Sequence, residues 1–319
     1  ITIDHGGSPD HKKAIQAASW LLSIGDWHKK NVSGTMVVRG RRLTELILGS
    51  KTEDIIISIT GLTLADCGSM QKILLSNIVT LQGTLDLSAI INLREIYADG
   101  TNLSQIKLPN GGGLEIIEYP ANNKYISFRN FPVLTTDGLR IGQCAVNITD
   151  FLIENCPLLN PMRLLSTIIV SQQNQGTEHV LKHIRAVGFN ETYDSYDILE
   201  VLLQLADGSY SGLSSEGLAG EEERPVLDGT LNIRTNCYED TAIALRSYFN
   251  RLVLNITGEY FIRFTDPIVL ARVLGLWDVN GDGGLTQSEA NLVTSIPDNF
   301  MSANVNTEYA NITTLAGFE

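Results

Sequence analysis

A single twelve-residue segment carries the clearest chemistry in the chain. Asp278–Glu289 reads DVNGDGGLTQSE, with oxygen-bearing groups at positions one, three, five, seven, nine and twelve. Gly283 at position six permits a sharp turn, and Glu289 at position twelve can bind a cation through both carboxylate oxygens. This spacing is typical of a loop that wraps one calcium ion. The predicted ligands are Asp278, Asn280, Asp282, the carbonyl group of Gly284, Thr286 and Glu289.

Helices are predicted on both sides of this loop. Asp266 and Pro267 are typical of a helix start, because Asp caps free backbone N–H groups and Pro suits the first helical position. A second helix is predicted over Ser288–Thr294. One such helix–loop–helix favours a structural ion, with an affinity of order 10⁻⁴ to 10⁻⁶ M, over a sensor built on paired loops. The alternative is a metal-free turn built on the Asn-Gly and Asp-Gly pairs.

Upstream of this unit, short apolar segments recur at regular intervals. The steps between them are mostly about ten to thirteen residues, so two steps give a period of about 22, which is typical of a stacked repeat. The predicted strands begin near Ile55, Leu62, Ile73, Leu85, Ile96, Ile106, Ile116, Ile126, Leu139 and Phe151.

These segments fit the leucine-rich-repeat template, Leu-x-x-Leu-x-Leu-x-x-Asn/Cys-x-Leu. Its alternate apolar residues point inward, and its Asn or Cys meets backbone groups at the bend. The template is matched at every position by Ile148, Phe151, Ile153, Cys156 and Leu158, and less completely by segments beginning at Ile59, Leu93 and Thr136. The alternative is an unrelated α/β domain with frequent strands.

Two parts of the chain resemble a known family. The segment 92–103 with 106–109, and the segment 264–296, are similar to leucine-rich-repeat surface proteins (BspA-like) of gut bacteria and their phages. The calcium loop also resembles dockerin modules, which use two duplicated loops and usually Asp at position twelve, where this chain has one loop and Glu289. The resemblance implies a leucine-rich-repeat solenoid followed by a calcium module, and Asn311–Leu315 looks like the start of a further repeat.

We therefore expect a β-rich α/β fold, a leucine-rich-repeat solenoid with a helical cap, followed by a small α/β region and a single EF-hand-like helix–loop–helix. The expected domains are an N-terminal helical cap (1–42), the solenoid (43–190), an irregular α/β C-terminal cap (191–258) with a flexible loop (207–229), and the calcium module with the start of a further repeat (259–319).

The cap helix is predicted from Ser8 to Gly25, and further helices over Gly176–His183, Ser195–Leu205 and Glu239–Asn250. Strands are predicted at Leu231–Ile233 and Leu252–Ile256. Because the chain begins at Ile1 and stops at Glu319 inside an apparent repeat, we expect a piece of a longer protein.

Composition excludes several classes of partner. The formal net charge of −13 argues against nucleic acid, because phosphate binding needs a concentrated basic surface. No run of about 18 apolar residues occurs, so no membrane span is expected. The four cysteines stand at Cys67, Cys144, Cys156 and Cys237, and we expect free, buried thiols because a chain of this size does not need disulfides.

No catalytic site is predicted. His179 and His183 have a spacing that could bind zinc on a helix, but Val180 stands where the metalloprotease pattern requires Glu. Neither a phosphate-binding glycine loop nor a Gly-x-Ser-x-Gly motif occurs. A pair of carboxylates for glycoside hydrolysis would depend on the fold.

The predicted function is therefore non-enzymatic: adhesion or receptor binding by an extracellular, cell-surface or virion-exposed protein with a structural calcium site. Its expected partners are a protein or glycan receptor on a cell surface, or neighbouring subunits. One alternative is an architectural segment of a phage tail or surface assembly. Another is an accessory region of a carbohydrate-active enzyme. Clustered exposed aromatic residues among Tyr97, Tyr119, Tyr125 and Phe128 would favour receptor binding, whereas their burial against neighbouring subunits would favour the architectural alternative.

Overall fold

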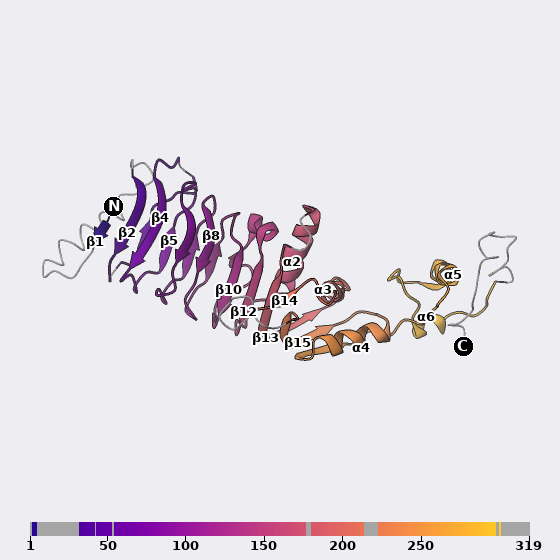
Figure 1. Cartoon of the computed structure of the whole chain (residues 1–319). Coiled ribbons are helices and arrows are strands. Elements are labelled where there is room, and N and C mark those ends of the chain that lie inside the picture. The colour runs from indigo at the N-terminus through magenta and orange to yellow at the C-terminus, as the bar shows by residue number, and fades with distance from the viewer. Residues whose placement is uncertain are drawn as a thin grey trace. The chain divides into compact units, whose positions relative to one another are not determined.

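The computed structural model describes residues 2–4, 32–41, 43–52, 54–176, 180–213, 223–297 and 300. The chain divides into two compact units (Figure 1). The first comprises residues 1–190 and 204–229, and the second comprises residues 191–203 and 230–319. The predicted cap helix and the segment 311–315 lie outside the described residues, as does the part of loop 207–229 that runs from 214 to 222.

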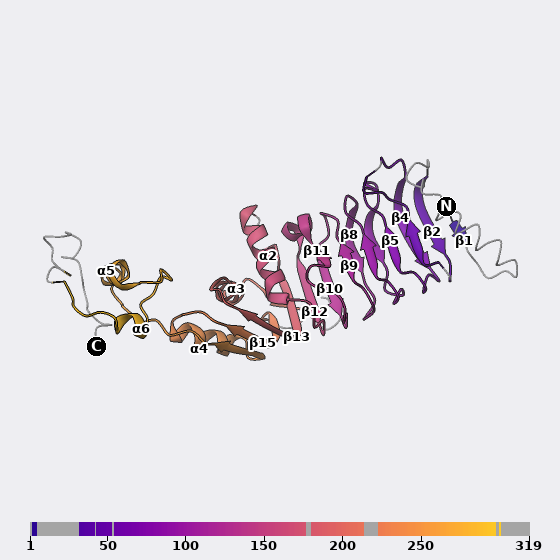
Figure 2. The same cartoon turned by 180° about the vertical axis from the view of Figure 1, so that it is seen from behind.

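The first unit is built from short parallel strands in several sheets (Figures 1 and 2). One sheet has the order β1 (Thr2–Asp4), β2 (Ser33–Arg39), β4 (Ser58–Ala65). A second has the order β11 (Leu139–Arg140), β9 (Ile116–Glu118), β7 (Glu95–Tyr97), β5 (Lys72–Leu74), β3 (Glu45–Ile47). β6 (Gln82–Asp86) pairs with β8 (Asn102–Lys107). β10 (Tyr125–Arg129) pairs with β12 (Asp150–Glu154), β12 with β13 (His183–Tyr193), and β13 with β14 (Ser211–Gly212).

The register of the five-stranded sheet shows how the chain returns to each layer. The central residues of its strands pair in the order Leu46, Ile73, Ile96, Ile117, Leu139, and all five are buried. Between the paired residues 46, 73, 96, 117 and 139, the steps in sequence are 27, 23, 21 and 22 residues. Each layer therefore adds a rung of aliphatic side chains to one continuous core.

The predicted fold class, a leucine-rich-repeat solenoid with a helical cap, a small α/β region and an EF-hand-like unit, is wrong. The structure is a β-rich α/β fold with several separate parallel sheets and few helices. The reason lies in the segments between the strands of the five-stranded sheet. The template specifies one apolar strand per repeat, but here the intervening segments also form strands, and these enter other sheets: β6 and β8 lie between β5, β7 and β9 along the chain.

The individual strands were predicted more accurately than their assembly. Every predicted strand position except Ile55 lies in a strand. The predicted helix over Gly176–His183 is wrong, because the helix α2 occupies Pro161–Asn174 and residue 183 begins a strand. Pro161 at the helix start and the apolar face of α2 against the core explain this placement. A 3-10 helix, η2 (Gly142–Asn147), precedes β12.

The second unit contains the remaining helices and two strands. Its elements are α3 (Asp197–Leu205), β15 (Val226–Ile233), α4 (Glu239–Tyr248), β16 (Leu252–Ile256), α5 (Pro267–Trp277) and α6 (Gln287–Ala290), of which α3 and β15 extend into the first unit. The predicted helices at 195–205 and 239–250 and the strands at 231–233 and 252–256 are confirmed. Thr257 N donates to Ile233 O over 3.0 Å, and Arg234 N to Tyr193 O over 2.8 Å, so these backbones lie side by side.

Asparagine side chains join successive turns of the first unit. Asn130 has a φ of 58° and Asn155 a φ of 52°, in the left-handed region that Asn tolerates better than most residues. Asn130 Nδ2 donates to Asn110 Oδ1 over 2.8 Å, and Asn130 Oδ1 accepts from Asn155 Nδ2 over 3.2 Å. The stacked amides therefore hold neighbouring layers in register at the end where the strands turn.

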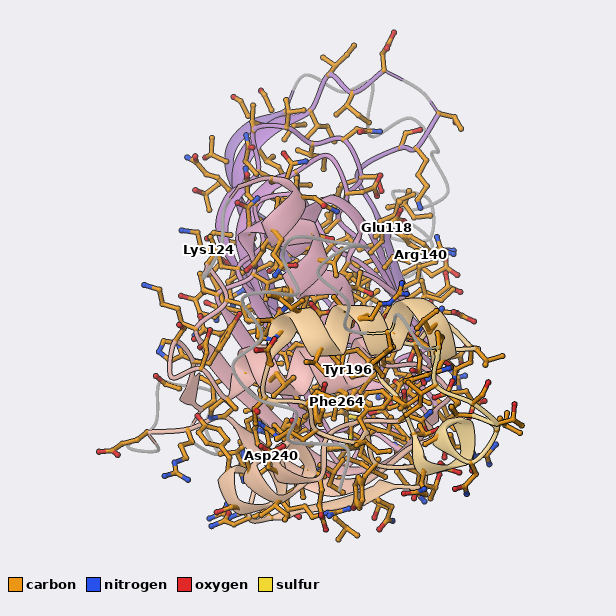
Figure 3. All side chains as sticks on the ribbon, turned by 90° about the vertical axis from the view of Figure 1, so that its right-hand side faces the viewer. Glu118, Lys124, Arg140, Tyr196, Asp240 and Phe264 are labelled. Atoms are coloured by element: carbon orange, nitrogen blue, oxygen red, sulfur yellow. The ribbon has the colours of Figure 1, made fainter. Side chains whose placement is uncertain are left out.

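Charged side chains cross the outer face of the five-stranded sheet. Glu118 forms an ion pair with Lys51, and Arg140 Nη1 lies 3.7 Å from Glu118 Oε2 (Figure 3). Lys72 Nζ lies 2.9 Å from Glu95 Oε2. Because these groups are partly exposed, each pair adds only a few tenths of a kcal/mol, roughly up to 1 kcal/mol.

All four cysteines are free and buried, as predicted. Burial raises the pKa of Cys144 to about 12, so this thiol stays protonated and unreactive at neutral pH. None of the helices in the described ranges is long and apolar enough to cross a membrane.

The Asn130 turn provides a test of the amide ladder. Replacing Asn130 with Ala removes both hydrogen bonds and puts at a φ of 58° a residue that tolerates the left-handed region less well than Asn, so we expect the free energy of unfolding to fall by about 2 kcal/mol. Replacing Asn130 with Gly removes the same bonds without the strain and should cost about half as much. Urea unfolding of both variants measures this. Equal stability of wild type and Asn130→Gly would contradict a role for the ladder.

A second test concerns a buried phenol. Tyr119 is 4% exposed, and its hydroxyl has no hydrogen-bond partner among the described residues. Burial also raises the pKa of Tyr119, so the hydroxyl stays neutral. Because an unsatisfied buried hydroxyl is costly, Tyr119→Phe should raise the free energy of unfolding by about 1 kcal/mol. The half-buried Tyr125 provides the control, since Tyr125→Phe should change stability little; a destabilised Tyr119→Phe variant would refute the expectation.

Candidate metal centre

The helix α5 and a small apolar core position the loop Asp278–Glu289. Asp266 caps the start of α5, with its carboxylate accepting from Ile268 N over 2.9 Å and Val269 N over 3.3 Å. The helix therefore starts at Pro267, as predicted, and ends at Trp277, directly before the loop. The core beneath it consists of Phe264, Val269, Val273, Leu285 and Phe300.

Two contacts fix the loop on this core. Leu285, at position eight, is 4% exposed and belongs to the core cluster. Its carbonyl oxygen accepts from Ile262 N over 2.7 Å. Gly284 lies against the ring of Phe261 so closely that a Cβ there would come within 2.2 Å of the ring. The position therefore requires glycine for close packing.

Backbone N–H groups of the loop converge on the first carboxylate. Asp278 Oδ1 accepts from Gly281 N over 2.8 Å and from Asp282 N over 3.2 Å, and Oδ2 accepts from Gly283 N over 3.0 Å. Gly281 and Gly283 have φ values of 72° and 85°, which residues with a side chain rarely adopt. The glycines thus allow the chain to curl around the Asp278 side chain.

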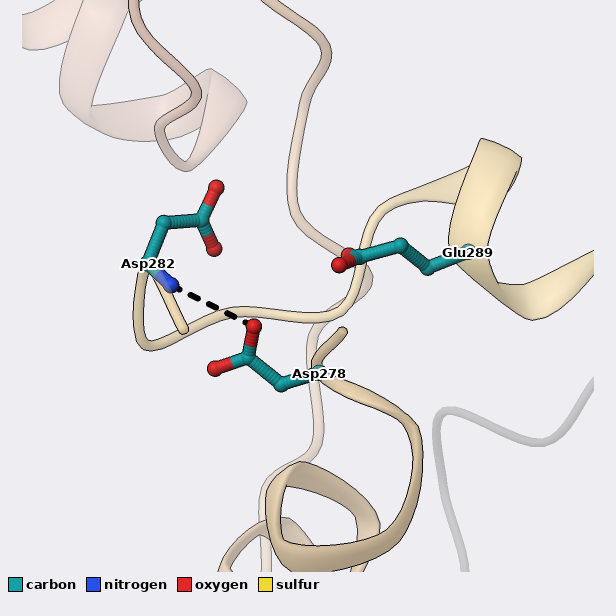
Figure 4. A group of neighbouring side chains, drawn as sticks. All are labelled: Asp278, Asp282 and Glu289. Atoms are coloured by element: carbon teal, nitrogen blue, oxygen red, sulfur yellow. Dashed lines mark hydrogen bonds between the residues drawn. The ribbon is translucent and has the colours of Figure 1, made fainter. Parts of the chain in front are cut away.

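Asp278, Asp282 and Glu289 come together at the centre of the loop (Figure 4). One carboxylate oxygen from each lies within 4.8 Å of the others. Within the described part of the chain, no Lys or Arg side chain forms an ion pair with any of the three. Like charges this close repel one another, and a cation between them would remove the repulsion. These three residues are therefore arranged so that they could hold a metal ion.

Glu289 connects the two ends of the loop. It is only 7% exposed, and its Oε1 accepts from Val279 N over 3.1 Å and from Asn280 N over 3.4 Å. Its Oε2 accepts from Thr286 N over 3.0 Å, and Thr286 Oγ1 accepts in return from Glu289 N over 3.3 Å. This reciprocal pair is a capping box at the start of α6.

The other predicted ligands lie around the three carboxylates. Asn280 Oδ1 accepts from Asp282 N over 2.9 Å, and its amide donates to Asp282 Oδ2 over 3.1 Å. Thr286 is engaged in the capping box, and Gly284 N donates to Asp282 Oδ1 over 3.2 Å. The structure therefore places all six predicted residues in one hydrogen-bonded loop, in which the carboxylates of Asp278, Asp282 and Glu289 are grouped.

Two residues outside the motif, Asn236 and Glu259, form hydrogen bonds with the loop. Asn236 Nδ2 donates to Asp282 Oδ2 over 2.8 Å, and Asn236 Oδ1 accepts from Glu259 N over 2.7 Å. The Glu259 carboxylate accepts from the backbone N–H and the hydroxyl of Ser288, and these bonds lower the pKa of Glu259. Sequence reasoning missed both, because Asn236 is 46 residues from its partner and no pattern links the two.

The second helix is shorter than predicted. The structure has α6 over Gln287–Ala290, whereas Ser288–Thr294 was predicted. Leu292 is 69% exposed, so the segment after α6 lacks the buried face that would stabilise a longer helix.

The position of His183 agrees with the sequence argument against a zinc site at His179 and His183. This residue lies on the strand β13, not on a helix, and its Nδ1 is 2.8 Å from Asp150 Oδ1. His179 lies outside the described residues. In the described ranges, the calcium-like loop supplies the one group of three or more His, Cys, Asp or Glu side chains that could hold a metal.

The contact between Gly284 and Phe261 provides a test of how the loop is seated. Gly284→Ala should destabilise the second unit by roughly 1 to 3 kcal/mol, because Phe261 must move. Gly275→Ala is a matched control, since a Cβ at this exposed helical glycine meets nothing within 4 Å, and helix propensity favours alanine there. Hydrogen exchange of the second unit distinguishes the two variants. Equal protection in both would show that the loop is not seated on Phe261.

A scan against protein-family models, a search of curated proteins and a search of solved structures each found no match for this chain.

Proposed function

We propose that the loop Asp278–Glu289 binds one calcium ion, which stabilises the second unit. The observation that supports this proposal most directly is the group of three carboxylates formed by Asp278, Asp282 and Glu289. Asn280, the Gly284 carbonyl group and Thr286 would complete the shell, directly or through water. Together these groups offer the six to eight oxygen ligands that calcium takes.

The ligand chemistry favours calcium over other metals. Every predicted ligand is an oxygen, whereas zinc and copper sites in proteins draw on His or Cys. Magnesium demands near-ideal octahedral geometry and keeps several waters, so it is poorly suited to a loop with a bidentate Glu at its end. The backbone N–H groups of Val279 and Asn280 already orient Glu289 toward the loop.

The proposed role of the ion is structural. It would join Asp278, at the end of α5, to Glu289, on α6. Through Asp282 and Asn236 it would also reinforce the contact with the segment that follows β15. Binding to the folded loop stabilises the unit by mass action, by about 2.7 kcal/mol when calcium is at one hundred times its Kd.

We further propose that the protein is non-enzymatic and acts in adhesion or receptor binding outside the cell or on a virion. The resemblance of residues 264–296 to surface-protein modules and the rigid, many-layered β scaffold support this. The four aromatic residues named above do not form an exposed cluster. Tyr119 and Phe128 are buried in the chain's own core, and Tyr97 and Tyr125 are half-buried. Because Tyr119 and Phe128 are buried within the chain itself and not against neighbouring subunits, they also give no support to the architectural alternative.

Thermal unfolding with calcium and with chelator tests the metal proposal. We expect millimolar calcium to raise the Tm of the wild-type protein and to leave an Asp278→Ala/Glu289→Ala variant unchanged, because the variant loses two of three carboxylates. Magnesium at the same concentration should have a much smaller effect.

The control is Glu200→Ala/Glu239→Ala, which removes two exposed acidic residues of the helices α3 and α4. It should respond to calcium like the wild type, which would separate a specific site from general screening of the negative charge. A wild-type Tm that does not depend on calcium would refute the proposal.

A further inference from the structure

Two neighbouring strands of the first unit part from each other. β8 ends one sheet and β10 begins another. Among the described residues, hydrogen bonds join the two strands only near their starts. Lys124 N donates to Ser104 O over 3.0 Å, and Asn122 Nδ2 donates to Asn102 Oδ1 over 3.1 Å. In the described residues, no ladder of backbone hydrogen bonds follows between β8 and β10. The two edges therefore diverge.

The composition of the core changes at this break between sheets. The layers up to β8 have aliphatic interiors, whereas the layer of β10 introduces Phe128, which packs edge-on against Tyr119 and Phe131 with ring centroids 6.5 and 5.8 Å away. Aromatic rings need more room than the Ile and Leu side chains of the preceding layer.

A cavity of about 360 Å³ lies between the diverging strands. Its apolar wall includes Ile106, Ile126 and Leu152. Its polar wall carries side chains that can donate or accept hydrogen bonds, namely Gln105, Asn110, Tyr125, Ser127, Arg129 and Asp150. This combination of a small apolar surface with converging polar groups is typical of small-molecule sites.

Each charged group at the cavity lies near a charged or hydrogen-bonding partner, and the His183 imidazole beside Asp150 carries charge only when it is protonated. Asp150 lies 2.8 Å from His183 Nδ1, and Lys107 is directly opposite Asp86 in the β6–β8 ladder. Arg129 Nε lies 3.2 Å from Glu154 Oε2. The cavity therefore has no large excess of either charge and does not favour an ionic ligand.

Hydrogen-bonding capacity nevertheless remains at the cavity. The amide nitrogens of Gln105 and Asn110 make no hydrogen bond within the described residues, whereas their oxygens accept from Thr84 Oγ1 over 3.4 Å and from Asn130 Nδ2 over 2.8 Å. These two amides can therefore donate to a ligand rich in oxygen.

We propose that this cavity binds one pyranose ring of a neutral glycan. Sugar hydroxyls both donate and accept, so they match the amide groups of Gln105 and Asn110 and the carboxylate of Asp150. The C–H face of a pyranose ring is apolar and fits the ring of Tyr125 and the aliphatic wall. This site lies wholly within the first unit and does not depend on the proposed calcium site.

Saturation-transfer NMR on the full chain tests the proposal with methyl glycosides of glucose, galactose, mannose and N-acetylglucosamine, and with methyl glucuronide as a charged probe. We expect at least one neutral glycoside to bind with a Kd of roughly millimolar order, as single rings usually do. Ser127→Trp, which fills the cavity, should weaken this binding by about tenfold or more. The same measurement on Asp278→Ala/Glu289→Ala should show binding unchanged.

Gln82→Trp is the matched control, because Gln82 is exposed on β6 and does not line the cavity. It should bind like the wild type. If Ser127→Trp lowers the Tm, Gln105→Ala replaces it, with a smaller loss of affinity expected. The proposal is overturned if no neutral glycoside binds, if filling the cavity leaves binding unchanged, or if only the glucuronide binds.

Discussion

The first unit depends on the satisfaction of backbone and amide groups where each strand turns into the next. Parallel strands stacked at close spacing satisfy one another along their length, and backbone hydrogen bonds between layers continue into the turns, where Asn130 N donates to Glu154 O and Asn155 N to Val187 O, each over 2.9 Å. The side chains add a second set of contacts between layers, because Asn130 donates to the amide oxygen of Asn110 and Asn155 donates to that of Asn130. Gly188 continues the column, because a Cβ there would lie 2.8 Å from Asn155 Oδ1. Small or amide residues at these positions allow the layers to approach closely enough for the aliphatic rungs to pack.

The same principle extends to the buried polar groups inside the unit. Gln172, on α2, is 2% exposed, and its amide nitrogen donates to Ala145 O and Ile148 O while its oxygen accepts from Leu181 N. One side chain thereby satisfies three backbone groups of the adjoining segments, which no strand pairs. Tyr119, Asn123 and Arg129 are exceptions, since each has a buried polar atom without a hydrogen-bond partner among the described residues, and the Tyr119 hydroxyl lies in the aromatic region of the core. The divergence of β8 and β10 begins in this same region.

The two candidate sites differ in the balance of charge among their side chains. In the loop of the second unit, three carboxylates converge without a cationic side chain, so the arrangement gains from a divalent cation. In the cavity of the first unit, acidic and basic groups are paired, so a neutral ligand with many hydroxyl groups is the better match. The proposed calcium site and the proposed sugar-binding cavity are both compatible with the proposed role in receptor binding.

Sequence alone determined the features that depend on local spacing. The oxygen-bearing positions of Asp278–Glu289, the Asp266–Pro267 helix start and the apolar strands near Ile73, Ile96 and Phe151 are read within a dozen neighbouring residues. Backbone geometry couples such neighbours directly, so their pattern is sufficient.

Only the tertiary structure decided how these parts assemble. An apolar residue at each repeat position is equally compatible with one sheet or with several, because burial does not specify the partner strand; the predicted solenoid failed for that reason. Likewise, the contact of Asn236 with Asp282 and the parting of β8 from β10 depend on packing between residues far apart in the chain. Their energies come from contacts that exist only after folding, and no local pattern encodes them.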